Sequence, residues 1–162
     1  MKKVILCALV LAVSGVLVNS VLAQKPRYVV TYIRSQTGEG IQSATAVTVI
    51  NQSDNSSCEV QVEWFTPSGT SVCTHASIVA PGDVREFCSR PLQFETGCIV
   101  PCTPPLTNLV LGKAIVSSTD VFECSLLAVE ARVYYTTGVN DTTLLAISNS
   151  KIVFAGDGNI GD

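Results

Sequence analysis

The sequence predicts an all-β protein, built as an antiparallel β-sandwich of the immunoglobulin-like or Greek-key type and stapled by disulfides. Three observations predict it. Short runs of β-branched and aromatic residues recur with turn residues between them about every 8–12 positions. No stretch has the apolar periodicity of an amphipathic helix. Six of the seven cysteines follow a segment typical of an export signal. A jelly roll or a small β-barrel is the alternative architecture.

Residues 1–23 have the pattern of a cleaved signal peptide. Met1-Lys2-Lys3 is a short positive start, an unbroken apolar run extends from Val4 to Val13, and Val21-Leu22-Ala23 suits cleavage before Gln24. We therefore expect a secreted or periplasmic protein, and the compact Lys-Lys signal is typical of bacteria. No other apolar run approaches the roughly 18 residues of a membrane helix, so we expect no membrane insertion after cleavage.

The remaining chain is long enough for one domain, predicted over 24–155, with a flexible, acidic, Gly-rich tail at 156–162. The whole chain has a formal net charge of −3, and 14% of its residues are charged. The low charged fraction excludes charge-driven disorder. The acidic balance argues against binding to nucleic acid.

The first five predicted strands alternate with recognisable turns. The segments 28–33 and 44–50 are rich in β-branched and aromatic residues, with a Gly-containing loop between them. The polar turn 51–57 leads into 58–64, whose apolar and polar side chains alternate strictly, as in a half-buried strand. Pro-Gly turns at 66–69 and 80–83 bound the next two predicted strands, 70–79 and 84–88.

A Pro-rich segment at 89–108 breaks this rhythm. A loop of about 20 residues is unusual in a compact domain and is often functional or held by disulfides, so we expect a disulfide-pinned crossover between two sheets.

Four strands are predicted after this loop. Val110–Ser117 is the first of these strands, and 127–135 alternates apolar side chains with Glu130 and Arg132. A turn at 138–141 precedes the last two, 144–148 and 151–154.

The cysteines that remain after loss of Cys7 indicate structural disulfides rather than a metal site. Their spacing lacks the repeated C-x-x-C pairs of zinc sites, and six cysteines allow 15 connectivities. We expect Cys73–Cys88 across the 80–83 hairpin, Cys98–Cys102 within the loop, and Cys58–Cys124 between distant strands. The disulfide candidates are thus Cys58, Cys73, Cys88, Cys98, Cys102 and Cys124.

No motif predicts a catalytic, cofactor or metal site. The G-x-G-x-x-G run at 156–161 has no helix after it to hold a pyrophosphate, and the same tail lacks the bidentate Glu of a calcium loop. His75 is the only histidine and no G-x-S-x-G elbow exists, which disfavours a nucleophile–base pair. Glu59 and Glu63 lie about 13 Å apart along a strand, too far for a glycosidase pair. A hydrolase is the least favoured hypothesis.

We therefore predict a protein that acts by binding a protein partner or by self-association. The Tyr28–Ile33 strand, apolar on both faces, is either an ordinary strand of the sheet or one that pairs with a neighbouring subunit. Loop 89–108 is the second contact surface. A carbohydrate- or small-ligand-binding module that uses exposed aromatic rings is the alternative. The contact candidates are Tyr28, Tyr32, Trp64, Phe65 and Tyr134.

Overall fold

The computed structural model describes residues 26–38, 40–92, 97–100, 102–118, 124, 126–138 and 141–154. The signal peptide and the acidic tail predicted from the sequence lie outside these residues. The described part holds nine strands and no α-helix. The strands are β1 (Arg27–Gln36), β2 (Gln42–Asn51), β3 (Cys58–Phe65), β4 (Ser71–Val79), β5 (Val84–Cys88), β6 (Asn108–Ser118), β7 (Leu127–Thr137), β8 (Thr143–Asn149) and β9 (Ile152–Phe154).

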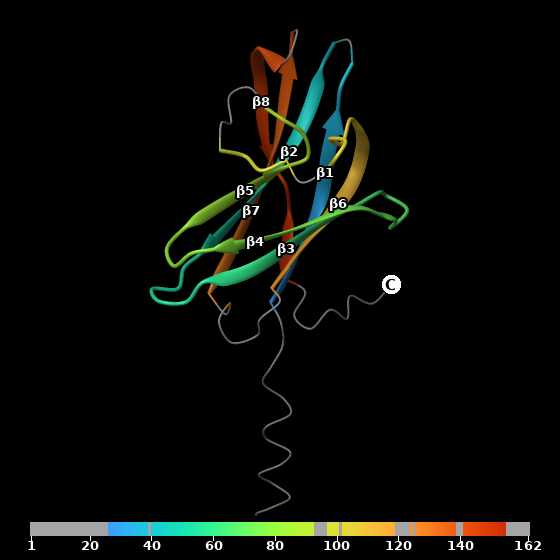
Figure 1. The fold of residues 1–162 in the computed structure, drawn as a ribbon. Helices are drawn as coiled ribbons and strands as arrows, with labels where there is room; N and C mark the ends of the chain where they lie inside the picture. Colours follow the sequence, from blue (N-terminus) through green and yellow to red (C-terminus); the bar gives the residue numbers. More distant parts are fainter. Residues whose placement is uncertain are drawn as a thin grey trace, which may run out of the picture.

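All nine strands belong to one antiparallel sheet, which curls into a half-barrel (Figure 1). The main path runs β4-β3-β6-β1-β2-β7-β8. β5 pairs with β2 and β9 pairs with β1, both off this path. β1 and β2 pair as strands only where Gln36 faces Ser43, and the Thr45 hydroxyl bridges to the Arg34 backbone beyond that point. This short pairing leaves room for β5 beside β2 and for β9 beside β1.

The alternation in β3 positions the core. Cys58, Val60, Val62 and Trp64 are buried, whereas Glu59 on the opposite face is exposed. The inward side chains of β3 pack against those of β1, β2 and β6, because the curl brings distant strands face to face. The alternating pattern thus predicts correctly which face of this strand is buried.

Loop 89–107 makes β2 buried on both faces. On one face Val47 and Val49 enter the main core. On the other, Ala44 and Ala46 pack with Leu92 and Tyr134 in a second small core, to which Cys88, Cys98 and Val100 contribute. Two sets of backbone hydrogen bonds hold the loop. Ile99 exchanges bonds of 2.8 Å with the β5 backbone at Cys88 and Glu86, and Leu106 N donates to Ser89 O at 2.9 Å.

Three cysteine pairs lie at disulfide distance. Cys58–Cys124 is as the sequence predicts, with Cα atoms 5.2 Å apart. The other two expected pairs are wrong, since the structure joins Cys73 to Cys102 and Cys88 to Cys98. The physical reason is that β4 and β5 form no hairpin ladder: β4 pairs with β3, whereas β5 crosses to β2. Cys73 and Cys88 therefore never face each other, and each takes a partner from the long loop.

Candidate functional site

The aromatic contact candidates divide into buried and half-buried side chains. Trp64 and Tyr134 lie in the two cores with 0% and 1% of their surface exposed, so neither side chain is accessible to another molecule. Tyr28, Tyr32 and Phe65 are half-buried. The Tyr28 hydroxyl donates to Leu127 O at 2.5 Å, and burial raises the pKa of that hydroxyl.

The Tyr28–Ile33 strand is an inner strand. β1 is bonded along one edge to β6, and along the other to β9 and, at Gln36, to β2. Both of its edges are therefore engaged within the chain, so it offers no free edge for pairing with a neighbouring subunit. This corresponds to the ordinary-strand alternative of the sequence analysis.

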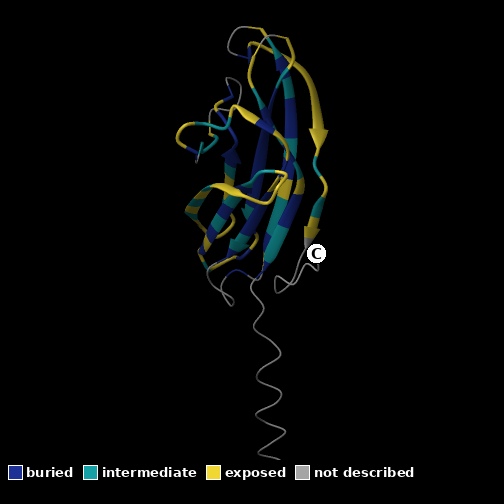
Figure 2. Ribbon diagram, turned by 90° about the vertical axis from the view of Figure 1, so that its right-hand side faces the viewer, coloured by how far each residue is buried: buried dark blue, intermediate teal, exposed yellow. Residues whose placement is uncertain are grey.

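An open edge of the sheet lies at β8 instead. Among the described residues, β8 pairs with β7 alone, and all seven of its residues are exposed. Leu144, Leu145 and Ile147 expose 44%, 50% and 49% of their surface. Figure 2 shows this strand running along one side of the molecule, exposed over its length. Because no charged residue and no proline occurs between Asp141 and Lys151, the edge lacks the usual features that prevent edge-to-edge pairing.

A bulge in the pairing with β7 places Leu144 and Ile147 of β8 on a common face. The register with β7 slips between Tyr135 and Thr136, so that Ile147 lies opposite Tyr134 and Leu144 opposite Thr136. Residues directly opposite in an antiparallel ladder share a face. Leu144 and Ile147 therefore lie on the same face of the sheet as Tyr134.

The chain then crosses from one strand partner to another. Ser150 N donates to Ala131 O of β7 at 2.9 Å, while Ser150 Oγ donates to Tyr32 O of β1 at 2.6 Å. Lys151 O accepts from Thr31 N at 3.0 Å, and β9 continues along β1. Val153 of β9 is also exposed. We call the continuous segment 143–154 the β8–β9 edge.

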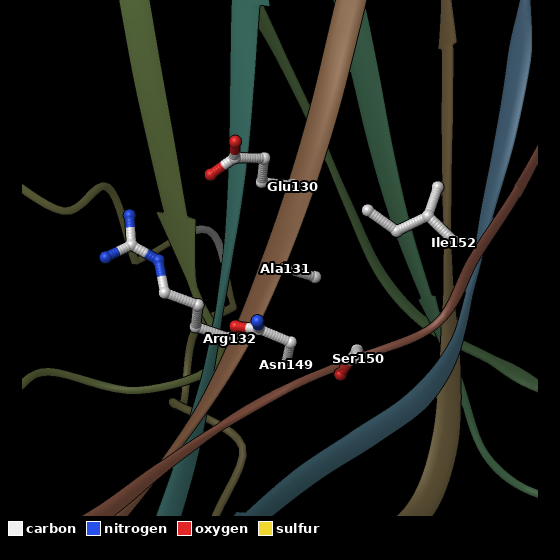
Figure 3. Close-up of a pocket in the computed structure, with 6 residues that line it drawn as sticks. All are labelled: Glu130, Ala131, Arg132, Asn149, Ser150 and Ile152. Atoms are coloured by element: carbon white, nitrogen blue, oxygen red, sulfur yellow. The ribbon is translucent and has the colours of Figure 1, made fainter.

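A cavity of about 270 Å³ opens at this crossing. Figure 3 shows Glu130 and Arg132 projecting from one side of β7, with Ala131 and Ile152 on the other. Asn149 and Ser150 complete the lining. The cavity thus combines a small apolar floor with an anionic, a cationic and two neutral polar groups, next to the exposed strand.

A second polar group lies on β1 and β7. The Tyr32 and Tyr135 hydroxyls are 3.5 Å apart, and the Arg34 guanidinium carbon lies 5.8 Å from the centre of the Tyr135 ring. The hydrogen bond between the two hydroxyls lowers the pKa of Tyr32 and raises that of Tyr135. The contact of the Arg34 guanidinium with the Tyr135 ring is of the cation–π type.

A buried ion pair fastens the turn that leads into β8. Arg90 Nη2 donates to Asp141 Oδ1 at 2.8 Å, and Nη1 donates to Oδ2. Arg90 Nε also donates to Ser43 O at 3.0 Å, and Thr136 Oγ1 donates to Asp141 Oδ1. The Arg90 guanidinium lowers the pKa of the Asp141 carboxyl, with help from the Thr136 hydroxyl and against the effect of burial. The β7–β8 turn is therefore held to the long loop.

Sequence reasoning missed both the open edge and this ion pair. The signal for the edge was present, since Leu-Leu-Ala-Ile does not alternate and is flanked by uncharged residues. The run Tyr28–Ile33 is more strongly β-forming, and for that reason the sequence points to it, and not to 143–149, as the strand that pairs with a neighbouring subunit. Arg90 and Asp141 sit in turn-like contexts, and no local pattern joins residues 51 positions apart.

The described residues show no group of three or more His, Cys, Asp or Glu side chains arranged for a metal ion. His75 is half-buried, and its ring lies 5.8 Å from the ring of Phe87. Within the same part of the chain, no helix has the length and apolar character needed to cross a membrane.

Comparison with known proteins gives one weak structural likeness. No protein-family model matches the chain, and no curated protein sequence does either. The chain is similar to a solved structure described as "Crystal Structure of Thermotoga maritima 1070", with a TM-score of 0.46 and 8% sequence identity. The match covers 78% of this chain and 92% of that one.

Proposed function

We propose that this is an exported protein that binds other polypeptides by strand addition at β8, in a structural or interaction role and without catalysis. One observation carries the proposal: β8 is an uncharged strand, exposed at all seven residues and partly apolar, that is bonded on one side only among the described residues. Soluble proteins usually protect such edges with charges, proline or a covering segment. An edge left open in this way is suited to β-augmentation.

The chemistry of strand addition fits what β8 offers. An added strand gains backbone hydrogen bonds along the edge, and its side chains add apolar contacts with Leu144, Leu145 and Ile147. The cavity at Glu130 and Arg132 lies at the end of the strand and can take a polar side chain of the added segment. Backbone hydrogen bonds would thus supply affinity for the added strand, and the cavity would supply specificity for its sequence.

We propose export to the cell surface or periplasm of a bacterium, after removal of a signal peptide. The three cysteine pairs support an oxidising compartment. We also propose that the curled sheet works as a disulfide-stapled β-sandwich, with β4-β3-β6-β1-β9 as one layer and β5-β2-β7-β8 as the other. The main core, which contains residues of both groups, supports this description.

Binding of a small polar ligand, such as a sugar, in the cavity is a second candidate. It is favoured by the convergence of Glu130, Arg132, Asn149 and Ser150 on one opening. No aromatic ring is among the residues that line it, so a sugar would bind without stacking. Shifts of the Asn149 side-chain amide in nuclear magnetic resonance spectra, titrated with mono- and disaccharides, test this candidate. An unchanged spectrum would contradict it.

Site-specific photo-crosslinking in living cells tests the main proposal. A photoreactive phenylalanine analogue at Leu145, which is exposed on β8, should give an adduct of defined mass with another polypeptide. The same analogue at Val84, a comparably exposed residue on β5, is the matched control. Adducts from position 145 alone support strand addition at β8. No adduct from 145, or the same adducts from both positions, would contradict it.

A further inference from the structure

We propose that the polypeptide that adds to β8 is strand β4 of a second copy of this chain, so that copies join head to tail into one continuous sheet. This inference rests on the proposed function of strand addition at β8. It goes further by naming the partner, the strand of the partner that is used, and the open-ended assembly that results.

The two ends of the sheet are the first observation. The main path begins at β4 and ends at β8, and in the described residues each of these strands is bonded to one neighbour only, β3 and β7 respectively. β4 is also long enough to accept β8, since it has nine residues against seven. The main path therefore ends in two unlike edges, one at each end of a single sheet.

Both edges carry apolar side chains that point to solvent. On β4, Ile78 and Val72 expose 64% and 38% of their surface. On β8, Leu145 and Ile147 are exposed to a similar extent. Joining the two edges would cover apolar surface from both, in the way that a buried interface core does.

Charge favours the pairing of β4 with β8 over the pairing of β4 with β4. The segment from Cys58 to Cys88, which contains β3, β4 and β5, has four carboxylates and Arg85, for a net charge of −3. Glu59 lies opposite Ile78 and Glu63 opposite Thr74, so two of the carboxylates flank the β4 edge. The β8–β9 edge has a single charged residue, Lys151, which is exposed. Pairing β4 with β8 brings the acidic segment to an uncharged strand that is followed by Lys151, whereas pairing β4 with β4 would oppose like charges.

Symmetry then determines what assembles. Contact between two different surfaces of one chain is heterologous, and it grows into a ring if the rotation closes or into a filament if it does not. Each added copy leaves a fresh β8 at one end and a fresh β4 at the other. The predicted product is therefore a concentration-dependent series of oligomers rather than a single symmetric dimer.

Two edge-blocked variants of the full chain test this directly. Leu145→Glu places a negative charge on the β8 edge, which the acidic β4 edge would repel. Ile78→Lys places a positive charge on the β4 edge. Both side chains are exposed, so each variant should keep the wild-type thermal unfolding curve. If either fails to fold, Ile147→Glu and Val72→Lys block the same two edges at other exposed positions.

Light scattering of the purified proteins is the measurement. Wild type should form oligomers, each variant alone should be monomeric, and an equimolar mixture should associate again. Association returns because the mixture still contains one intact β8 edge and one intact β4 edge, and because the two substituted edges carry opposite charges. The variant Lys151→Glu should weaken wild-type association about two- to five-fold, as removal of an exposed charge pair does.

The failure of this inference and that of the proposed function give different results. If Ile78→Lys still dimerises and Leu145→Glu does not, β8 pairs with β8, and the head-to-tail arrangement is overturned while strand addition stands. If wild type stays monomeric, self-assembly is overturned. In that case an adduct between position 145 and a different protein would still support the proposed function, and the absence of any adduct would overturn both.

Discussion

Arg90 in the long loop and Asp141 at the start of the β8 hairpin form a buried bidentate ion pair, with only 5% and 7% of their side-chain surfaces exposed. The pair joins two segments that sit next to the second core. Through it, the loop that covers the outer face of β2 also holds the turn that presents β8. The position of the open edge thus depends on a polar contact far from it in sequence.

Loss of the Asp141 charge should destabilise the protein strongly. Asp141→Asn leaves the Arg90 guanidinium buried without its counter-charge, and breaking such a pair costs about 3–5 kcal/mol of unfolding free energy. The matched control is Asp83→Asn, which removes an exposed pair with Arg85 at 3.3 Å. That change should cost at most about 1 kcal/mol. Urea denaturation of both variants checks the difference, and equal losses would contradict this role for the buried pair.

The same pair predicts a loss of stability in acid. Arg90 lowers the pKa of Asp141 in the folded chain below the roughly 3.9 of an unfolded aspartate. The stabilisation that follows is therefore fully present above about pH 4 and is lost as the pH falls through the lower folded-state value. Unfolding free energies measured from neutral pH to pH 2 should show the gap between wild type and Asp141→Asn closing in that range. A gap that stays constant with pH would count against the assignment.

Gly112 in β6 should not tolerate a side chain. A Cβ atom at this position would lie 2.6 Å from Phe65 O and 2.9 Å from Leu109 Cγ. Gly112→Ala should therefore lower the unfolding free energy by about 1–3 kcal/mol, the usual cost of overpacking. Gly97→Ala is the control, because no atom lies within 4 Å of its Cβ position. It should change stability by less than about 0.5 kcal/mol, and a Gly112→Ala variant as stable as this control would be the contrary result.

The disulfides should differ in what they contribute. Cys58–Cys124 joins residues 66 positions apart, whereas Cys88–Cys98 spans 10. In the chain-entropy description, closure of the longer loop stabilises by roughly 4 kcal/mol and closure of the shorter one by roughly 3 kcal/mol. Double Cys→Ala variants of each pair, unfolded in urea, should therefore rank with the 58–124 variant least stable. The reverse order would show that strain or packing outweighs loop closure.

The strands themselves were predictable because their signals are local. The alternation of Cys58, Val60, Val62 and Trp64 with glutamates, and the Pro-Gly turn before Asp83, each depend on residues close in sequence. All nine strands were therefore predicted near their actual bounds. What local signals do not contain is the partner of each strand, and so β5 was assigned to β4 instead of β2.

The candidate site was less predictable for the same reason. Whether Tyr28–Ile33 or 143–149 lies at an edge depends on which strands β6, β7 and β9 pair with, and this pairing is a property of the whole sheet. Burial of Tyr134 likewise depends on a loop some 40 positions earlier folding over its face. The composition of β8 indicates a strand that is apolar on both faces, and only the topology shows that it is exposed.

Amide hydrogen exchange of the full-length oxidised protein, compared at low and high protein concentration, tests the central claim most directly. The account predicts that the β8 amides gain protection as concentration rises, and that the β4 amides gain it over the same range. Protection that appears elsewhere, for example only in loop 89–107, or an exchange pattern that does not change with concentration, would contradict assembly through the free ends of the sheet.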